Sequence, residues 1–306
     1  MAALPSYDLK QIARPVKTYS TAFLVFSAVA LQAVASLCYP ISKYGLGFIE
    51  PFTFAFFRYL LSSTVLLLIV KLRKYEVPVE RKDFPKIFLI GFIIIIFNQT
   101  LFVVGQAMTA AGHGAFIFST TPVLVFILAM IHLKEKFHWR RAVGSVLAFV
   151  GVLIIISSGA IEISTRYLIG DVIIVLSVTA WAYYTILGRD LVRKYGALRM
   201  TAYALSFGSA VYFPFGLFMA LKFDYSQATP AAWGAVVYMA LGLSVFVYVM
   251  WYWLLKYMEA SRVAVFHNIQ PVIATVVAYF FLGETLTLPF LFGGAVVLAG
   301  VITSES

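Results

Sequence analysis

The sequence predicts an all-α membrane protein of ten transmembrane helices with little chain outside the bilayer. Of its 306 residues, 62% are hydrophobic and 12% are charged, whereas about a quarter of the residues in soluble domains are charged. A helix needs about 20 apolar residues to cross the hydrocarbon core of a bilayer. Ten such helices with short connections account for almost the whole chain, so we expect no large soluble domain.

Ten hydrophobic runs define the expected helices. The first 18 residues carry three basic residues and no apolar run, and the first apolar run is too long for a signal peptide, so residues 1–18 are expected to be a cytoplasmic tail before an uncleaved helix. The third and fourth runs are separated at the stretch from Gly105 to Gly114. The ten runs cover residues 19–44, 50–72, 84–107, 110–132, 138–157, 167–190, 197–221, 230–256, 260–282 and 286–303.

Basic residues alternate between the two ends of these helices and predict their orientation. With the N-terminus in the cytoplasm, 19 of the 23 lysine and arginine residues fall in inner segments. Only Lys43, Arg166 and Lys222 fall in outer segments, and Arg58 lies within the second span. By the positive-inside rule, both termini are expected in the cytoplasm. Because the basic residues lie between hydrophobic runs rather than along one polar face, we expect no nucleic-acid partner.

The two halves of the chain match each other at a shift of 149 residues. The matched pairs include Ala111 and Ala260, Pro122 and Pro271, Glu135 and Glu284, Gly144 and Gly293, and Gly151 and Gly300. We place the first repeat at residues 19–160 and the second at residues 165–303. Each repeat has five helices, an odd number, so the second should cross the membrane in the opposite sense. Such inverted repeats are typical of secondary transporters, whose substrate site lies near the midplane between the halves.

The repeated motifs resemble a known family. Each half carries small residues, a proline inside a helix, a glutamate at a helix end and a Gly-x6-Gly helix, and Arg58 and Trp181-Ala182 complete the pattern. Over nearly the whole chain this resembles the EamA family of the drug/metabolite transporter superfamily, although Lys134 stands where a glycine is usual. The resemblance implies a ten-helix transporter, and within the family the chain looks most like bacterial aromatic amino-acid exporters.

Polar and aromatic side chains within the spans are the candidate substrate site, because an unpaired polar group in lipid is costly. Amide and hydroxyl groups are expected to bind the ammonium and carboxylate of an amino acid, while aromatic rings enclose its side chain. The competing interpretation is hydrogen bonding between helices. The candidate residues are Tyr39, Asn98, Gln99, Trp181, Tyr184, Tyr248, Trp251, Tyr252, His267, Asn268 and Gln270.

Other residues are assigned mechanical or structural roles. Pro122 and Pro271 each remove a backbone hydrogen bond at matching positions, so we expect them to be gating hinges, with a fixed kink as the alternative. For Arg58 we favour structural pairing over contact with substrate. Glu135 and Glu284 are expected to cap helix ends or pair there with basic residues. The glycines of the fifth and tenth spans are expected to let those two helices pack together, away from the cavity.

The favoured function is export of neutral or aromatic amino acids and related metabolites by alternating access through a central cavity. A multidrug or nucleobase exporter of the same fold is the alternative, and an intramembrane enzyme is a remote one, since no G-x-S-x-G or H-E-x-x-H motif is present. We expect no enzymatic activity, cofactor or metal. The expected partners are a small-molecule substrate and the lipid bilayer of a prokaryotic inner membrane, and the sequence leaves open whether the chain acts as a monomer or as a dimer through the glycine-rich face.

Overall fold

The chain folds into a bundle of helices. In the computed structural model the described residues are 19–73, 75, 78–109, 111–157, 165–273, 276 and 288–305. These residues form helices and connecting turns, with no β-strand among them, so the all-α prediction is confirmed. The tail of residues 1–18 and Glu284 lie outside the described residues.

The first half contributes a series of helices, several of them in two pieces. Glu50 caps the N-terminus of α3. Its carboxylate accepts hydrogen bonds from Phe52 N at 3.0 Å and Thr53 N at 2.9 Å, and Pro51 lies in the first turn. The elements are α1 (Thr21–Ser36), α2 (Cys38–Gly45), α3 (Pro51–Leu72), α4 (Phe84–Phe92), the π-helical segment η3 (Ile93–Thr100), α5 (Leu101–Met108), α6 (Ala111–Phe118), α7 (Thr121–His132) and α8 (Trp139–Ser157).

The second half has a similar series. Thr229 caps α11 by accepting a hydrogen bond from Ala232 N at 3.2 Å, and Gly196, with φ of 87°, forms the turn between the two longest helices. The elements are α9 (Thr165–Tyr195), α10 (Ala197–Lys222), α11 (Pro230–Tyr238), the π-helical segment η5 (Met239–Val247), α12 (Tyr248–Tyr257), α13 (Ala260–Val265), the 3₁₀ turn η6 (Phe266–Asn268) and α15 (Leu288–Glu305).

Six helical segments within the described residues are long and apolar enough to cross a membrane. They are Thr21–Gly45, Pro51–Leu72, Arg81–Met108, Thr165–Tyr195, Ala197–Lys222 and Pro230–Tyr257. They coincide with six of the ten predicted spans, while Phe116–His132 and Leu291–Ser304 are shorter apolar helices. The break expected after the third span is present, since α5 ends at Met108 and α6 begins at Ala111. The count of ten spans stays a prediction.

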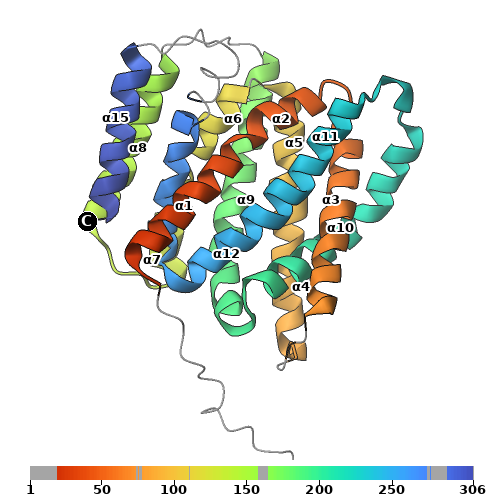
Figure 1. Ribbon diagram of the computed structural model, residues 1–306, viewed down its shortest axis with the longest axis horizontal. Helices are drawn as coiled ribbons and strands as arrows, with labels where there is room; N and C mark the ends of the chain where they lie inside the picture. Colours follow the sequence, from red (N-terminus) through yellow and green to blue (C-terminus); the bar gives the residue numbers. More distant parts are fainter. Residues whose placement is uncertain are drawn as a thin grey trace, which may run out of the picture.

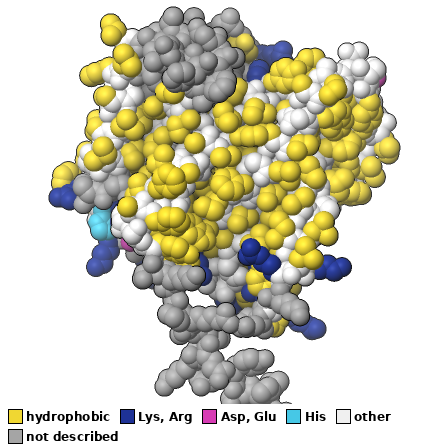
Figure 2. Space-filling view, in the orientation of Figure 1, with side chains coloured by type: hydrophobic (Ala, Val, Ile, Leu, Met, Phe, Trp, Pro, Cys, Tyr) yellow, Lys and Arg dark blue, Asp and Glu magenta, His cyan; other side chains and the backbone are white. Residues whose placement is uncertain are grey.

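The outer surface of the bundle is apolar. Figure 2 shows hydrophobic side chains over most of the visible face, with lysine and arginine gathered mainly at its lower end. Large side chains such as Phe26, Phe218 and Phe292 are more than half exposed, at 70%, 53% and 65%. A continuous apolar surface of this kind suits lipid contact, because hydrocarbon chains solvate it at no cost.

The glycine-rich helices pack as predicted. Figure 1 shows α8 and α15 side by side at one edge of the molecule, with α3 and α10 toward the opposite edge. A Cβ atom added to Gly144 would lie 2.5 Å from Gly300 O, and one added to Gly151 would lie 2.6 Å from Gly293 O. Only glycine therefore permits this approach, which confirms the expected contact between the fifth and tenth predicted helices.

Helix interruptions occur at equivalent places in the two halves. The third helix of each half contains a π-helical segment, η3 or η5, a feature that is frequent at functional sites. The fourth predicted helix breaks between α6 and α7, where Ser119 N donates to Phe116 O at 2.9 Å. In the ninth predicted helix, η6 occupies the matching position. Pro122 is the second residue of α7, and Pro271 is the third residue of the helical stretch after η6, so each proline lies in the first turn of a new helical segment.

Candidate functional site

A cavity of about 50 Å³ lies between elements from both halves, among side chains that are mostly buried. Its polar and aromatic lining consists of Gln32, Tyr39, Arg58, Asn98, Gln99, Phe102, Phe118, Trp181, Tyr248, His267 and Gln270. Its aliphatic lining, with one thiol, consists of Leu31, Ala35, Cys38, Leu243 and Val247. The lining comes from α1 to α3, both π-helical segments, α5, α6, α9, α12 and η6, and Gln270 follows η6.

The structure brings most of the predicted substrate residues to this cavity. Seven of the eleven line it, namely Tyr39, Asn98, Gln99, Trp181, Tyr248, His267 and Gln270. The other four, Tyr184, Trp251, Tyr252 and Asn268, are buried but lie away from the lining. The two predicted hinge prolines lie within four residues of lining residues in the sequence, since Pro122 is four residues after Phe118 and Pro271 directly follows Gln270.

A chain of hydrogen bonds between side chains crosses one wall of the cavity. Tyr39 OH donates to Gln270 Oε1 at 2.8 Å, and Gln270 Nε2 donates to Gln32 Oε1 at 2.5 Å. Gln32 Nε2 in turn donates to His267 Nδ1 at 3.3 Å. The chain joins α1 and α2 of the first half to the segment around η6 in the second half. These four buried polar groups therefore satisfy one another across the boundary between the halves.

Asn98 is held in place from two directions. Its Nδ2 donates to the backbone carbonyl of Ser177 at 2.8 Å and to Ser177 Oγ at 3.1 Å, while Ser177 Oγ donates back to Asn98 O at 2.9 Å. Tyr248 OH donates to Asn98 Oδ1 at 3.3 Å. Because its donors and its acceptor are all engaged, Asn98 ties η3 to α9 and α12 and orients the Tyr248 ring on the lining.

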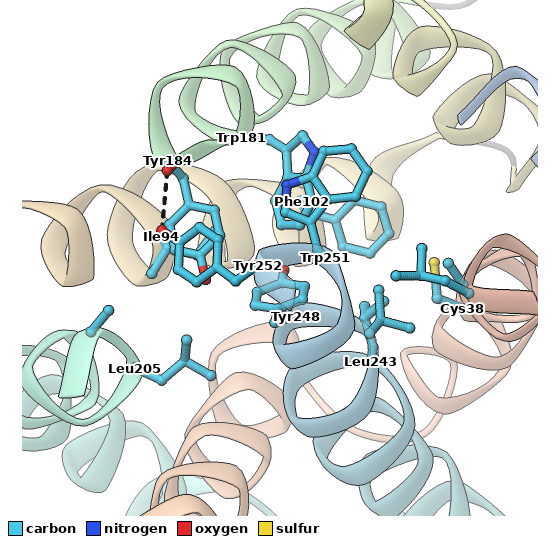
Figure 3. Close-up of a cluster of buried hydrophobic side chains, with 14 of the residues drawn as sticks. Cys38, Ile94, Phe102, Trp181, Tyr184, Leu205, Leu243, Tyr248, Trp251 and Tyr252 are labelled. Carbon is cyan, nitrogen blue, oxygen red and sulfur yellow. Dashed lines mark hydrogen bonds between the residues drawn. The ribbon is translucent and has the colours of Figure 1, made fainter. Parts of the chain in front are cut away.

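The aromatic residues form two layers. Trp181 faces the cavity, and its ring centroid lies 4.9 Å from that of Tyr248 and 5.3 Å from that of Trp251. Behind this layer, Tyr184 stacks on Tyr252 at 4.5 Å, and Tyr252 OH donates to Tyr184 O at 3.1 Å (Figure 3). The rear rings therefore support the front rings instead of contacting the cavity, which explains why prediction by residue type named both layers.

Arg58 is the charged group of the lining. It is fully buried, and its Nε donates to Ser244 Oγ at 3.0 Å. The structural pairing expected from sequence includes this contact, the nearby Tyr59 ring, whose centroid lies 5.9 Å from the guanidinium carbon, and the Tyr248 hydroxyl. None of the described aspartate and glutamate residues lines the cavity.

Sequence reasoning did not place several lining residues in the site. Gln32 is a polar residue within a span, and this feature could have identified it. Phe118 corresponds to His267 in the repeat at the shift of 149, so the internal repeat could have identified Phe118. Phe102 and Leu243 carried no such signal, because apolar residues that face a cavity, a neighbouring helix or lipid look alike in sequence.

Glu135, in the first half of the chain, forms hydrogen bonds with residues of the second half at one end of the bundle. Its carboxylate accepts hydrogen bonds from Ala260 N at 3.0 Å, Ser261 Oγ at 2.7 Å and Arg189 Nη1 at 2.7 Å. Arg141 reinforces the group by donating to Ser261 Oγ at 3.1 Å. Glu135 therefore caps α13 and pairs with a basic residue, the structural role expected from its place at a helix end. In the described part of the chain, no cluster of three or more His, Cys, Asp or Glu side chains forms a metal site.

Comparison with known proteins assigns a family. The EamA-like transporter family matches residues 21–157 and again residues 168–304. The uncharacterized transporter YyaM of Bacillus subtilis is 31% identical over 271 residues, which cover 87% of this chain and 88% of that protein. An uncharacterized transporter of Archaeoglobus fulgidus is 29% identical over 267 residues, which cover 87% of this chain and 92% of that protein.

Two further similarities concern fold and a named activity. A protein of Streptantibioticus cattleyicolor named "probable terminal-alkyne amino-acid exporter" is 29% identical over 222 residues, covering 72% of this chain and 73% of that protein. A solved crystal structure has the same fold, with a TM-score of 0.73, 14% identity, and coverage of 92% of this chain and 95% of that chain. Because the family matches both halves and so most of the sequence, the chain belongs to the EamA-like transporter family and is a membrane transporter.

Proposed function

We propose that the protein exports neutral and aromatic amino acids and related metabolites by alternating access through the central cavity. The observation that carries this proposal is a buried cavity, lined by amide groups and aromatic rings, at the contact between two matching halves. In transporters built from repeats, substrate sites lie at that contact near the bilayer midplane. The amino-acid exporter among the relatives supports this substrate class.

The proposal includes a topology of ten spans in two five-helix repeats of opposite orientation, with both termini in the cytoplasm of a prokaryotic cell. The double match of the family to residues 21–157 and 168–304 supports the repeat, as do the helix interruptions at equivalent places. The clustering of basic residues on alternate connections supports the orientation. Relatives in a bacterium and an archaeon support an inner, plasma-membrane location.

Alternating access requires the cavity to enlarge. A volume of about 50 Å³ holds a few water molecules, whereas pockets for small organic ligands measure roughly 300–1,000 Å³. The broken helices before Pro122 and Pro271 border the cavity and are the segments we propose to bend. Replacing either proline with alanine is expected to slow transport, while unchanged transport in both variants would reduce the prolines to fixed structural features.

The multidrug alternative predicts a cavity lining different from that of an amino-acid exporter, whereas the nucleobase alternative does not. A transporter of cationic drugs is served by an acidic side chain at the site, and none of the described acidic residues lines this cavity. A nucleobase exporter would use the same amide groups and rings, so transport measurements must separate it from an amino-acid exporter. Export of either kind leaves the substrate chemically unchanged, and we propose no enzymatic step.

Counterflow in proteoliposomes tests the proposal. Purified full-length protein is reconstituted, and vesicles are loaded in turn with neutral, aromatic and charged amino acids, a nucleobase and a cationic dye, with and without a pH gradient. Exchange of labelled neutral or aromatic amino acids above protein-free vesicles is the expected result. Movement of the dye alone, or of the nucleobase alone, would refute the amino-acid assignment, and comparison of the two gradient conditions shows whether protons are coupled.

A further inference from the structure

The Arg58 guanidinium is a buried cation without an acidic partner among the described residues. Arg58 has 0% exposure, its Nε donates to Ser244 Oγ, and its guanidinium also lies near the Tyr59 ring and the Tyr248 hydroxyl. The terminal nitrogens Nη1 and Nη2 have no hydrogen-bond partner, although Arg58 lines the cavity. An unpaired buried charge is among the costliest arrangements in a protein interior, so a partner that arrives from outside the chain would relieve a real penalty.

The remaining buried polar atoms of the lining that lack a hydrogen-bond partner are donors, like the terminal nitrogens of Arg58. They are Gln99 Nε2 and Trp181 Nε1, both buried and both carrying N–H groups. Every buried side-chain nitrogen or oxygen that lines the cavity without a partner is therefore a hydrogen-bond donor, and none is an acceptor. A cavity with one positive charge and only unused donors is complementary to an anion.

Ser244 holds two of these donor groups beside each other. Its Oγ accepts from Arg58 Nε at 3.0 Å, and its single proton lies between two acceptors, Gln99 Oε1 and Met239 O, each at 3.1 Å. This arrangement occupies one edge of the guanidinium and the carbonyl end of the amide, and it leaves Nη1, Nη2 and Gln99 Nε2 unused. Gln99 and Ser244 come from η3 and η5, so the two π-helical segments meet at this group.

We propose that Arg58 anchors the carboxylate of the transported molecule, with Gln99 as a second donor, and that the cavity selects small organic carboxylates with an apolar body. This inference rests on the proposed transport function and specifies its substrate class. A planar guanidinium matches a carboxylate through two parallel N–H···O hydrogen bonds. Phe102, Phe118 and Leu243 offer the apolar surface for the body. No described carboxylate on the lining matches an ammonium group, so carboxylates without one bind as well as amino acids do.

A ligand series tests the anchor without relying on transport. Binding of 3-phenylpropionate, 3-phenylpropanol, phenethylamine and phenylalanine to the purified full-length protein is measured by isothermal titration calorimetry. The first three share an aromatic ring and differ mainly in the head group. We expect the carboxylate to bind roughly 10- to 100-fold more tightly than the alcohol and the amine, the range for charge-assisted contacts. Equal or tighter binding of the amine overturns the proposal, as does absence of binding by all four.

Variants of Arg58 test whether its guanidinium is responsible for the preference for a carboxylate. R58Q is expected to reduce the affinity ratio of carboxylate to alcohol to near one, and R58K to keep an intermediate ratio, because lysine keeps the charge without the planar fork. The matched control is R81Q, at an exposed arginine outside the cavity, which should keep the wild-type ratio. A folded R58Q protein, judged by its size-exclusion profile, with the wild-type ratio overturns the proposal. If R58Q does not fold, R58K and the ligand series decide.

The two proposals fail in different ways. Arg58-dependent binding of carboxylates by a protein that moves no amino acid in vesicles would support the anchor and refute the exporter function. Amino-acid exchange that is unchanged in R58Q would support the exporter function and refute the anchor.

Discussion

Arg189 on α9 donates a 2.7 Å hydrogen bond to Glu135 after α7, and both side chains are more than nine-tenths buried. Glu135 belongs to the first half of the chain and Arg189 to the second, so this ion pair ties the halves together at one end of the bundle. The same carboxylate caps α13 through Ala260 N. Removing it takes the hydrogen-bonded carboxylate from the buried Arg189 side chain and leaves Ala260 N, at the start of α13, without this acceptor.

Glu135→Ala is therefore expected to destabilise the protein by about 3 kcal/mol, the lower range for breaking a buried pair. The measurement is thermal or denaturant unfolding of the purified protein. Glu80→Ala is the matched control, because Glu80 forms its ion pairs with Lys82 and Lys194 at the exposed surface. Equal loss of stability in the two variants would contradict the assigned role of Glu135.

Two buried asparagines offer a direct comparison. Asn98 uses both ends of its amide, whereas neither Oδ1 nor Nδ2 of Asn268 has a partner. Asn98→Leu is expected to cost about 1–2 kcal/mol, and Asn268→Leu to leave stability unchanged or raise it by up to about 1 kcal/mol, since no hydrogen bond is lost. Unfolding curves of the two variants test this. A larger loss for Asn268→Leu would mean that its amide has a partner in the protein.

The contact of α8 with α15 predicts different effects of two glycine-to-alanine changes. A Cβ atom at Gly151 would lie 2.6 Å from Gly293 O, whereas one at Gly294 finds its nearest neighbour, Val272 Cγ1, at 3.9 Å. Gly151→Ala is expected to lower stability by about 1–3 kcal/mol through overpacking. Gly294→Ala should raise it by about 0.5 kcal/mol, because alanine restricts the unfolded chain and favours the helix. The same shift in both variants would argue against close backbone packing.

Cys38 is the single cysteine of the chain and lines the cavity, so the wild-type protein already carries a probe. A small thiol reagent such as methyl methanethiosulfonate is expected to modify it slowly. A ligand at ten times its dissociation constant should slow the reaction about elevenfold, in proportion to site occupancy. Mass spectrometry of the intact protein gives the rate, with Cys38→Ser as the unreactive control. An unchanged rate with saturating ligand would place the ligand elsewhere.

The fold class followed from composition and from the repeat, because lipid imposes strict requirements on length and apolarity. The candidate site followed only in part. Tyr184 and Trp181 lie on the same helix three residues apart, yet one supports the ring layer and the other faces the cavity. Residue type does not distinguish those two positions.

Arg58 shows a second limit of prediction from sequence. Arg58 was assigned to structural pairing because a partner for a buried charge was expected, and whether one exists depends on contacts between distant segments. The π-helical segments add a third limit, since they change the angular step per residue in η3 and η5. A pattern based on 3.6 residues per turn therefore misplaces faces beyond them.

The hydrogen-bond chain from Tyr39 through Gln270 and Gln32 to His267 spans the two halves. If the halves separate on one side, these bonds break together. At about 0.6 kcal/mol for each bond in a membrane, the three bonds would favour the conformation described here over one that lacks them by roughly 20-fold. A substrate that hydrogen-bonds to the freed amides offsets this bias. Under the proposed alternating access, this hydrogen-bond chain would set how rarely the empty carrier opens, whereas a bound molecule would shift the population only by its stronger binding to the open state.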